Sequence, residues 1–170
     1  MTPTVQDRDV FVELRKFLIH LFPDVEVVQT QQNRSSPPRN AFITMNSRGR
    51  KRLSTNLRTY VDTEEKQAQD TVMPTEYTVQ LDFYGSGSGD RAQTFCTVFF
   101  DYTACDFFPE NVRPLFVTDP AQIPLTSGEE QFIERWTVEV KLQINPVVSV
   151  PMDFFENPSL TLIPVPLNEE

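Results

Sequence analysis

Residues 76–84, with the sequence EYTVQLDFY, carry the clearest structural pattern in this chain of 170 residues. Four apolar side chains alternate with polar ones along the stretch: Tyr77, Val79, Leu81 and Phe83. Because successive side chains of a strand point to opposite faces of a sheet, this alternation is typical of a strand with one buried face. Half-buried strands of this kind are common in antiparallel sheets. The stretch therefore predicts an antiparallel sheet that is covered on one face.

A second alternating stretch spans residues 131–145. Its apolar positions share one parity: Phe132, Trp136, Val138, Val140, Leu142 and Ile144. At about 3.3 Å per residue this strand would be nearly 50 Å long, so we expect it to bend or to extend beyond the body of the fold. From these two strands, we expect the core to include Leu81, Phe83, Trp136, Val138 and Leu142.

Two other segments have helical spacing. Acidic residues at Asp7 and Asp9 precede the first apolar series, which is typical of a helix start and predicts a helix over 7–21. The glycine-rich segment 85–89 predicts a turn, with Ser88 as a helix N-cap, and a second apolar series predicts a helix over 89–106. The sequence thus predicts an α+β fold, an antiparallel sheet with two main helices packed on one face.

The net charge is −9, but it is unevenly distributed. Seven of the 15 basic residues lie between positions 31 and 61, and all 24 acidic residues lie outside that window. Short strands are predicted at 25–30, 41–46 and 53–62, which would place SRGRKR (47–52) at the tip of a long hairpin. The candidate partner surface consists of Arg48, Arg50, Lys51, Arg52 and Arg58.

Three interpretations of this basic surface remain open: a nucleic-acid contact, a solvated loop, and a contact with an acidic protein surface, including that of an identical neighbour. The acidic remainder of the chain repels phosphate, and no aromatic residues that could stack on bases are interleaved with the basic ones. We therefore favour the protein contact.

The end of the chain differs in composition from the rest. Residues 63–75 are polar and are predicted to form a loop. The last twenty residues contain four prolines, which favour an extended arm with one short strand at 160–163. We expect a single domain over residues 1–150 and a proline-rich arm over 151–170.

The chemistry-bearing residues are few. The one histidine, His20, and the two cysteines, Cys96 and Cys105, predict neither a zinc site nor a catalytic triad. The segment GSGSGDR lacks the Lys-Ser/Thr pair of a P-loop and has Asp90 where a dinucleotide fingerprint needs its third glycine. No apolar run reaches the roughly 20 residues of a membrane span, and the start of the chain does not read as a signal peptide. We expect no enzyme activity, no cofactor and no metal.

Several of these stretches resemble the phage neck terminator proteins, relatives of the tail terminators of tailed phages. The resemblance spans roughly residues 5–155. It is carried by VQLDFYGSGSGDRAQTF (79–95), by RPLFVTD (113–119), and by EQFIERWTVEVKLQINPVVSVPMDFF (130–155). Its most specific parts are LDFYG, the ERW strand that ends in Asn-Pro, and DFF. None of these is a catalytic motif.

The resemblance implies a virion protein that assembles as a sixfold ring at the head-proximal end of a phage tail. Such a ring ends tail tube assembly and joins the tail to the head-to-tail connector. The implied partners are other copies of the chain, the tail tube protein, the sheath where there is one, and the connector, with DNA passing through the lumen without sequence-specific binding. It leaves open whether the tail is contractile. The alternative function is a small non-enzymatic binding module whose basic hairpin docks an acidic protein or a nucleic acid.

Overall fold

The structure is a computed structural model that describes residues 1–30, 40–63, 66–123, 125–126 and 132–153. Its helices are α1 (Asp7–Leu21), α2 (Ser88–Phe99) and α3 (Tyr102–Phe107). Its strands are β1 (Glu26–Gln29), β2 (Phe42–Arg52), β3 (Leu57–Asp62), β4 (Gln67–Val72), β5 (Thr75–Tyr84), β6 (Val112–Val117), β7 (Ala121–Gln122), β8 (Leu125–Thr126), β9 (Phe132–Ile133), β10 (Arg135–Ile144) and β11 (Val147–Pro151). The predicted α+β class is confirmed.

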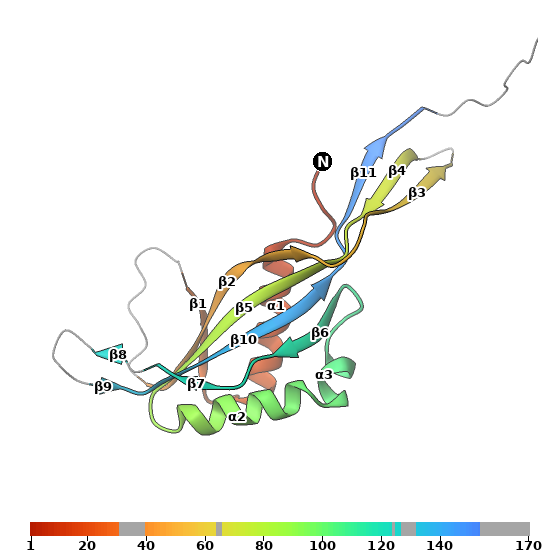
Figure 1. The fold of residues 1–170 in the computed structure, drawn as a ribbon. Helices are drawn as coiled ribbons and strands as arrows, with labels where there is room; N and C mark the ends of the chain where they lie inside the picture. The colour runs from red at the N-terminus through yellow and green to blue at the C-terminus, as the bar shows by residue number, and fades with distance from the viewer. Residues whose placement is uncertain (31–39, 64–65, 124, 127–131, 154–170) are drawn as a thin grey trace, which may run out of the picture.

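The main sheet has the strand order β1-β2-β5-β10-β6, with β7 also paired to β10. All its pairs are antiparallel except β1 with β2. Helices α1 and α2 lie side by side on one face of this sheet (Figure 1), where Phe17 of α1 contacts Phe95 and Phe99 of α2 edge to face. This face carries the alternating side chains Tyr77, Val79, Leu81 and Phe83 of β5, each at most 1% exposed.

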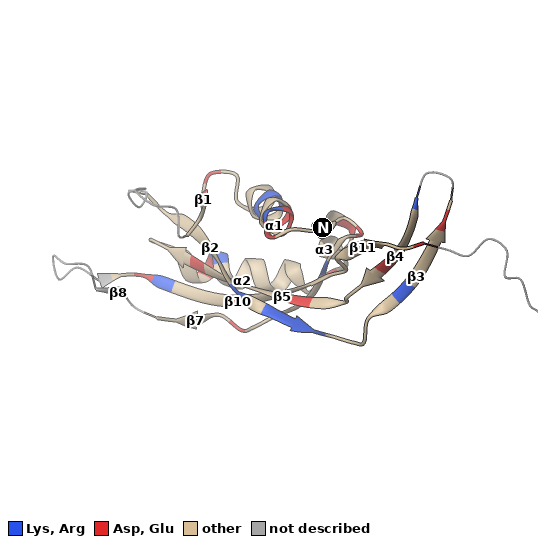
Figure 2. Cartoon of the chain, turned by 90° about the horizontal axis from the view of Figure 1, so that it is seen from above, with Lys and Arg blue, Asp and Glu red and all other residues tan. Residues whose placement is uncertain are grey.

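The three central strands of the main sheet continue into a second, projecting sheet. Strands β2, β5 and β10 lead into β3, β4 and β11, and the second sheet keeps the same neighbours, in the order β3-β4-β11. At the junction the Leu53 N–H donates to the Pro74 carbonyl and the Met73 N–H donates to the Pro146 carbonyl. Both prolines lack an N–H for the ladder, so the strands break and bend there. In Figures 1 and 2 the projecting sheet lies beyond the end of the helices.

The long hairpin expected around the basic segment has a different tip. Residues 48–52 lie inside β2, where Arg50, Lys51 and Arg52 pair with Tyr77, Glu76 and Thr75 of β5. The hairpin instead turns between β3 and β4, because β4 forms in the polar segment that was expected to be a loop. Strand β4 is stabilised by backbone hydrogen bonds to β3 on one side and to β11 on the other. The sequence of residues 67–72 does not indicate either pairing.

The second predicted helix is interrupted. Helix α2 ends at Phe99, and α3 begins at Tyr102 after Asp101, whose carboxylate accepts the Tyr102 N–H. Aspartate favours this N-cap conformation over a continuous helix. At the other end of α2 the N-cap is Gly87 rather than Ser88, because the backbone there has φ of 74°.

The residues expected in the core differ in their burial. Leu81, Phe83, Val138 and Leu142 are at most 1% exposed, whereas Trp136 is only partly buried. The indole lies against Gly89 in the first turn of α2 and lines a hollow there, and its Nε1–H donates to Glu134 Oε1 at 3.2 Å. Trp136 therefore borders the core instead of lying at its centre.

Beyond the main body, β11 ends at Pro151, and the strand expected at 160–163 lies outside the described residues. The expected boundary between a domain and an arm at residue 150 therefore stays a prediction. In the described part of the chain, no helix is long and apolar enough to cross a membrane.

Candidate functional site

The histidine and the two cysteines lie at separate places in the fold. His20 lies at the exposed end of α1 against the Phe107 ring, at 5.3 Å between centroids. Cys96 is buried, and burial raises its pKa to about 11, while Cys105 is exposed on α3. Within the described ranges, no group of three or more His, Cys, Asp or Glu side chains is placed to hold a metal ion.

The glycine-rich turn between β5 and α2 borders a hollow of about 400 Å³. Its lining includes Gly87 and Gly89 from the turn, but also the carboxylates Asp90 and Glu134. Two acids beside the backbone amides would repel a phosphate group. The arrangement therefore favours a structural turn, in which the Gly85 N–H donates to the Glu134 carbonyl at 3.1 Å.

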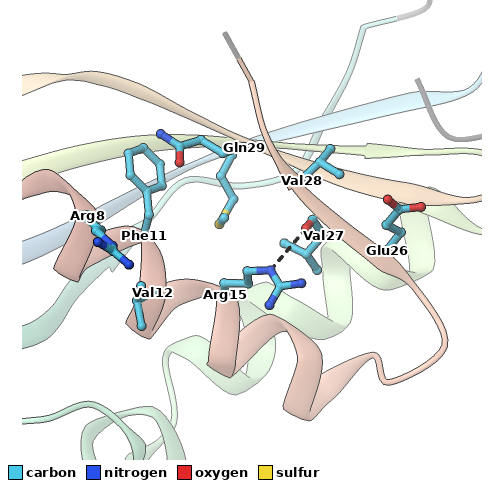
Figure 3. Close-up of a pocket in the computed structure, with 9 residues that line it drawn as sticks. Arg8, Phe11, Val12, Arg15, Glu26, Val27, Val28 and Gln29 are labelled. Atoms are coloured by element: carbon cyan, nitrogen blue, oxygen red, sulfur yellow. Dashed lines mark hydrogen bonds between the residues drawn. The ribbon is translucent and has the colours of Figure 1, made fainter. Parts of the chain in front are cut away.

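A second hollow, of about 390 Å³, opens between α1 and the edge strand β1 (Figure 3). Arg8, Phe11 and Arg15 line it from the helix, and the Arg15 Nε–H donates to the Val27 carbonyl at 3.4 Å. Glu26 also lines this hollow, so the pocket carries charges of both signs and gives no clear ligand preference.

The sheet face opposite the helices holds one buried carboxylate, Asp82. It accepts hydrogen bonds from Thr137 Oγ1 at 2.6 Å, Gln80 Nε2 at 2.8 Å and Arg135 Nη2 at 3.0 Å. The guanidinium also lies 5.8 Å from the Tyr84 ring centroid. Thr44 Oγ1 of β2 also donates to this carboxylate, at 3.4 Å, so the network joins the three neighbouring strands β2, β5 and β10. The alternation of residues 76–84 predicts that Asp82 lies on the polar face of its strand, but it does not indicate that this side chain is buried.

The five candidate basic residues separate into two groups. Two of them are paired within the subunit: Arg48 contacts Glu139 at 3.9 Å, and Arg50 contacts Asp7 and the Tyr77 ring. A β-bulge between Ser47 and Gly49 separates these two side chains onto opposite faces of the sheet. Lys51, Arg52 and Arg58 form no ion pair with any other residue that the structure describes.

These three cations lie on a surface that the fold leaves uncovered. Every residue from Ser47 to Tyr60 is exposed, although most of them belong to the paired strands β2 and β3. Strand β1 covers the outer edge of β2 only along residues 42–45, and no other strand of the described residues pairs with the rest of that edge. Large apolar side chains lie among the cations: Leu57 is 61% and Tyr60 is 58% exposed. We call Lys51–Tyr60 the basic arm.

The opposite edge of the sheet carries a surface that the sequence pattern did not reveal. Phe100 and Phe116 contact each other edge to face at 5.6 Å, yet they are 59% and 47% exposed. Tyr102, 73% exposed, follows on α3. The predicted helix over 89–106 was expected to pack on the sheet, and its exposed phenylalanine was not anticipated. The only sequence signal against this is that Phe100 falls outside the helical spacing of Phe95 and Phe99.

This second surface is acidic as well as aromatic. Asp101, Asp106 and Glu110 are all exposed, and the one cation of residues 100–116 is Arg113, whose guanidinium donates to the Cys105 and Phe108 carbonyls. The Asp106 carboxylate raises the pKa of the Tyr102 hydroxyl through a hydrogen bond and its negative charge. We call Phe100–Glu110 together with Leu115 and Phe116 the acidic corner.

Comparison with known proteins yields one family. A family model described as phage neck terminator protein matches residues 8–164 of the 170. No curated protein matches the chain significantly.

Proposed function

This chain belongs to the phage neck terminator protein family, and on that premise we propose that it forms a ring, of six subunits, at the head-proximal end of a phage tail. There it ends polymerisation of the tail tube and joins the tail to the head connector. The protein acts as a structural part of the virion, in the neck, and assembles in the host cytoplasm.

The observation that carries this proposal is the extent of the family match. Residues 8–164 include all three helices and both large sheets, so the whole fold, rather than a single motif, belongs to the family. The exposed basic arm and acidic corner support an assembly role. Paired strands with large apolar side chains in water are unusual for a free monomer and are typical of surfaces that a partner covers.

The proposed partners are the tail tube protein, the connector and, in a contractile tail, the sheath. Genomic DNA would pass through the ring without sequence-specific binding. The overall charge of −9 supports this, since an anionic wall does not retain phosphate. Duplex DNA mixed with the protein at physiological salt should show no binding, and micromolar affinity would instead favour a nucleic-acid binding module.

The function is tested in a phage that lacks the gene. We expect tails of irregular length and unattached heads, and complementation with the intact gene should restore uniform, head-joined tails. Light scattering of the purified 19.6-kDa chain measures the ring directly, and electron microscopy of tails should show a ring at the head-proximal end. Normal tails in the mutant, with heads attached, would overturn the proposal.

A further inference from the structure

We propose that the basic arm of one subunit binds the acidic corner of the next subunit, and that this contact closes the ring. The inference rests on the proposed ring and identifies the two surfaces that form it. The occupant of each surface is a second copy of this chain.

The first argument is the position of the two surfaces. The basic arm follows the open edge of β2 and β3, whereas the acidic corner lies at β6, the last strand at the other edge of the main sheet. Two different patches on opposite edges make a head-to-tail contact, in which each subunit offers one patch to each neighbour. Such contacts produce a closed ring when the rotation between neighbours is a whole fraction of a turn.

The second argument is charge. Residues 47–60 contain five basic and no acidic residues, whereas residues 100–116 contain three acidic residues and one basic residue, Arg113, which is held by the Cys105 and Phe108 carbonyls. Arg48 and Arg50 have partners inside the subunit, whereas Lys51, Arg52 and Arg58 pair with no acid in the described part of the chain, so we assign them to an external partner. Opposite charges on the two surfaces steer the correct pairing and disfavour contact between two arms or two corners.

The third argument is apolar area. Leu57 and Tyr60 on the arm, and Phe100, Tyr102 and Phe116 on the corner, are between 47% and 73% exposed. Aromatic side chains at the centre of an interface carry most of its binding energy, while exposed ion pairs add little individually. The apolar side chains would supply the affinity of this contact, and the charges would set its direction.

The test reverses charge on one surface at a time. The arm variant is Arg52→Glu with Arg58→Glu, and the corner variant is Asp106→Lys with Glu110→Lys. Lys51 is left intact because it lies opposite Glu76 in the ladder, and Asp101 is left intact because it caps α3. The matched control is Arg8→Glu with Lys16→Glu, two exposed cations on α1 that belong to neither surface.

Each variant alone should form fewer rings, with each contact weakened about tenfold at low salt and less at high salt. The control should assemble as the wild type does. Mixing the two variants in equal amounts should restore rings, because subunits that alternate around a sixfold ring meet opposite charges at every contact. A single chain with all four substitutions should also assemble. Circular dichroism and melting temperature establish that each variant is folded.

The outcomes separate the two proposals. If wild-type protein forms no ring in solution or on tails, the proposed function is overturned together with this interface. If wild-type rings form and both variants assemble as the control does, only the interface is overturned. Loss of assembly by the single variants without restoration in the mixture would also overturn it, because it would show that the two surfaces do not meet.

Discussion

Replacing Asp82 with alanine should destabilise the subunit far more than its place on the uncovered sheet face suggests. The side chain is only 6% exposed, and it pairs with Arg135, which is 20% exposed. Its removal leaves the guanidinium without its carboxylate and takes away the acceptor for Thr137 and Gln80. Breaking a buried ion pair by removing one partner costs about 3–5 kcal/mol. We expect Asp82→Ala to lower the free energy of unfolding by that amount.

The same sheet face supplies the control. Glu139 and Arg48 form an ion pair at 3.9 Å with both side chains substantially exposed, 42% and 52%. Such surface pairs contribute about 0–1 kcal/mol, so Glu139→Ala should change stability little. Removing Arg135 as well as Asp82 should recover part of the loss, since no unpaired charge then remains.

Urea unfolding followed by the fluorescence of Trp136, the single tryptophan, measures all of these variants. The free energies of unfolding of the variants should be compared at equal protein concentration, because ring formation would add stability. If Asp82→Ala costs less than about 1 kcal/mol, the same as Glu139→Ala, the Asp82 network does not hold β5 and β10 together as argued.

Three further predictions concern single residues. Phe17→Ala should lower the free energy of unfolding by about 3–5 kcal/mol in urea, because the ring is fully buried between the helices; a change below 1 kcal/mol would contradict this packing. Gly85→Ala should cost about 1–3 kcal/mol, since φ there is +87°, and an unchanged melting temperature would count against that turn. A thiol reagent at pH 8 should modify Cys105 quickly and Cys96 only after unfolding, because burial raises the Cys96 pKa to about 11 and leaves little thiolate. Rapid modification of both cysteines in the native protein would contradict the burial of Cys96.

The alternation of apolar residues in strands and their repeat every three or four residues in helices could be predicted, because burying one face of each element requires these patterns. A strand with one face against helices must alternate, as residues 76–84 do, and a helix on that face must repeat its apolar residues every three or four positions, as 7–21 does. Four of the five residues expected in the core are buried for this reason: Leu81, Phe83, Val138 and Leu142. The family could also be identified from the sequence, because its motifs extend over almost the whole chain.

The sequence did not indicate that two polar segments would pair as strands. Residues 47–52 and 67–72 look like loops because they are polar, yet both are strands. Backbone hydrogen bonds depend on the partner strand and hardly on side chains. Residues 47–52 are exposed at every position, and in 67–72 only Ala68 is buried, so neither segment carries an alternating apolar pattern. The same reason explains why the basic residues lie along a sheet edge instead of at a hairpin tip.

The acidic corner was decided by tertiary structure alone. Phe100 is exposed because α2 ends one residue before it, and Phe116 is exposed because it pairs with Lys141, on the polar side of β10, whereas its neighbour Val117 pairs with the buried Val140. Neither fact is local to the phenylalanines themselves. The sequence by itself determined the fold class, the family and a cluster of positive charge. Only the packing of distant segments determined that this cluster lies along β2 and β3, and that an aromatic, acidic surface lies at β6, at the other edge of the main sheet.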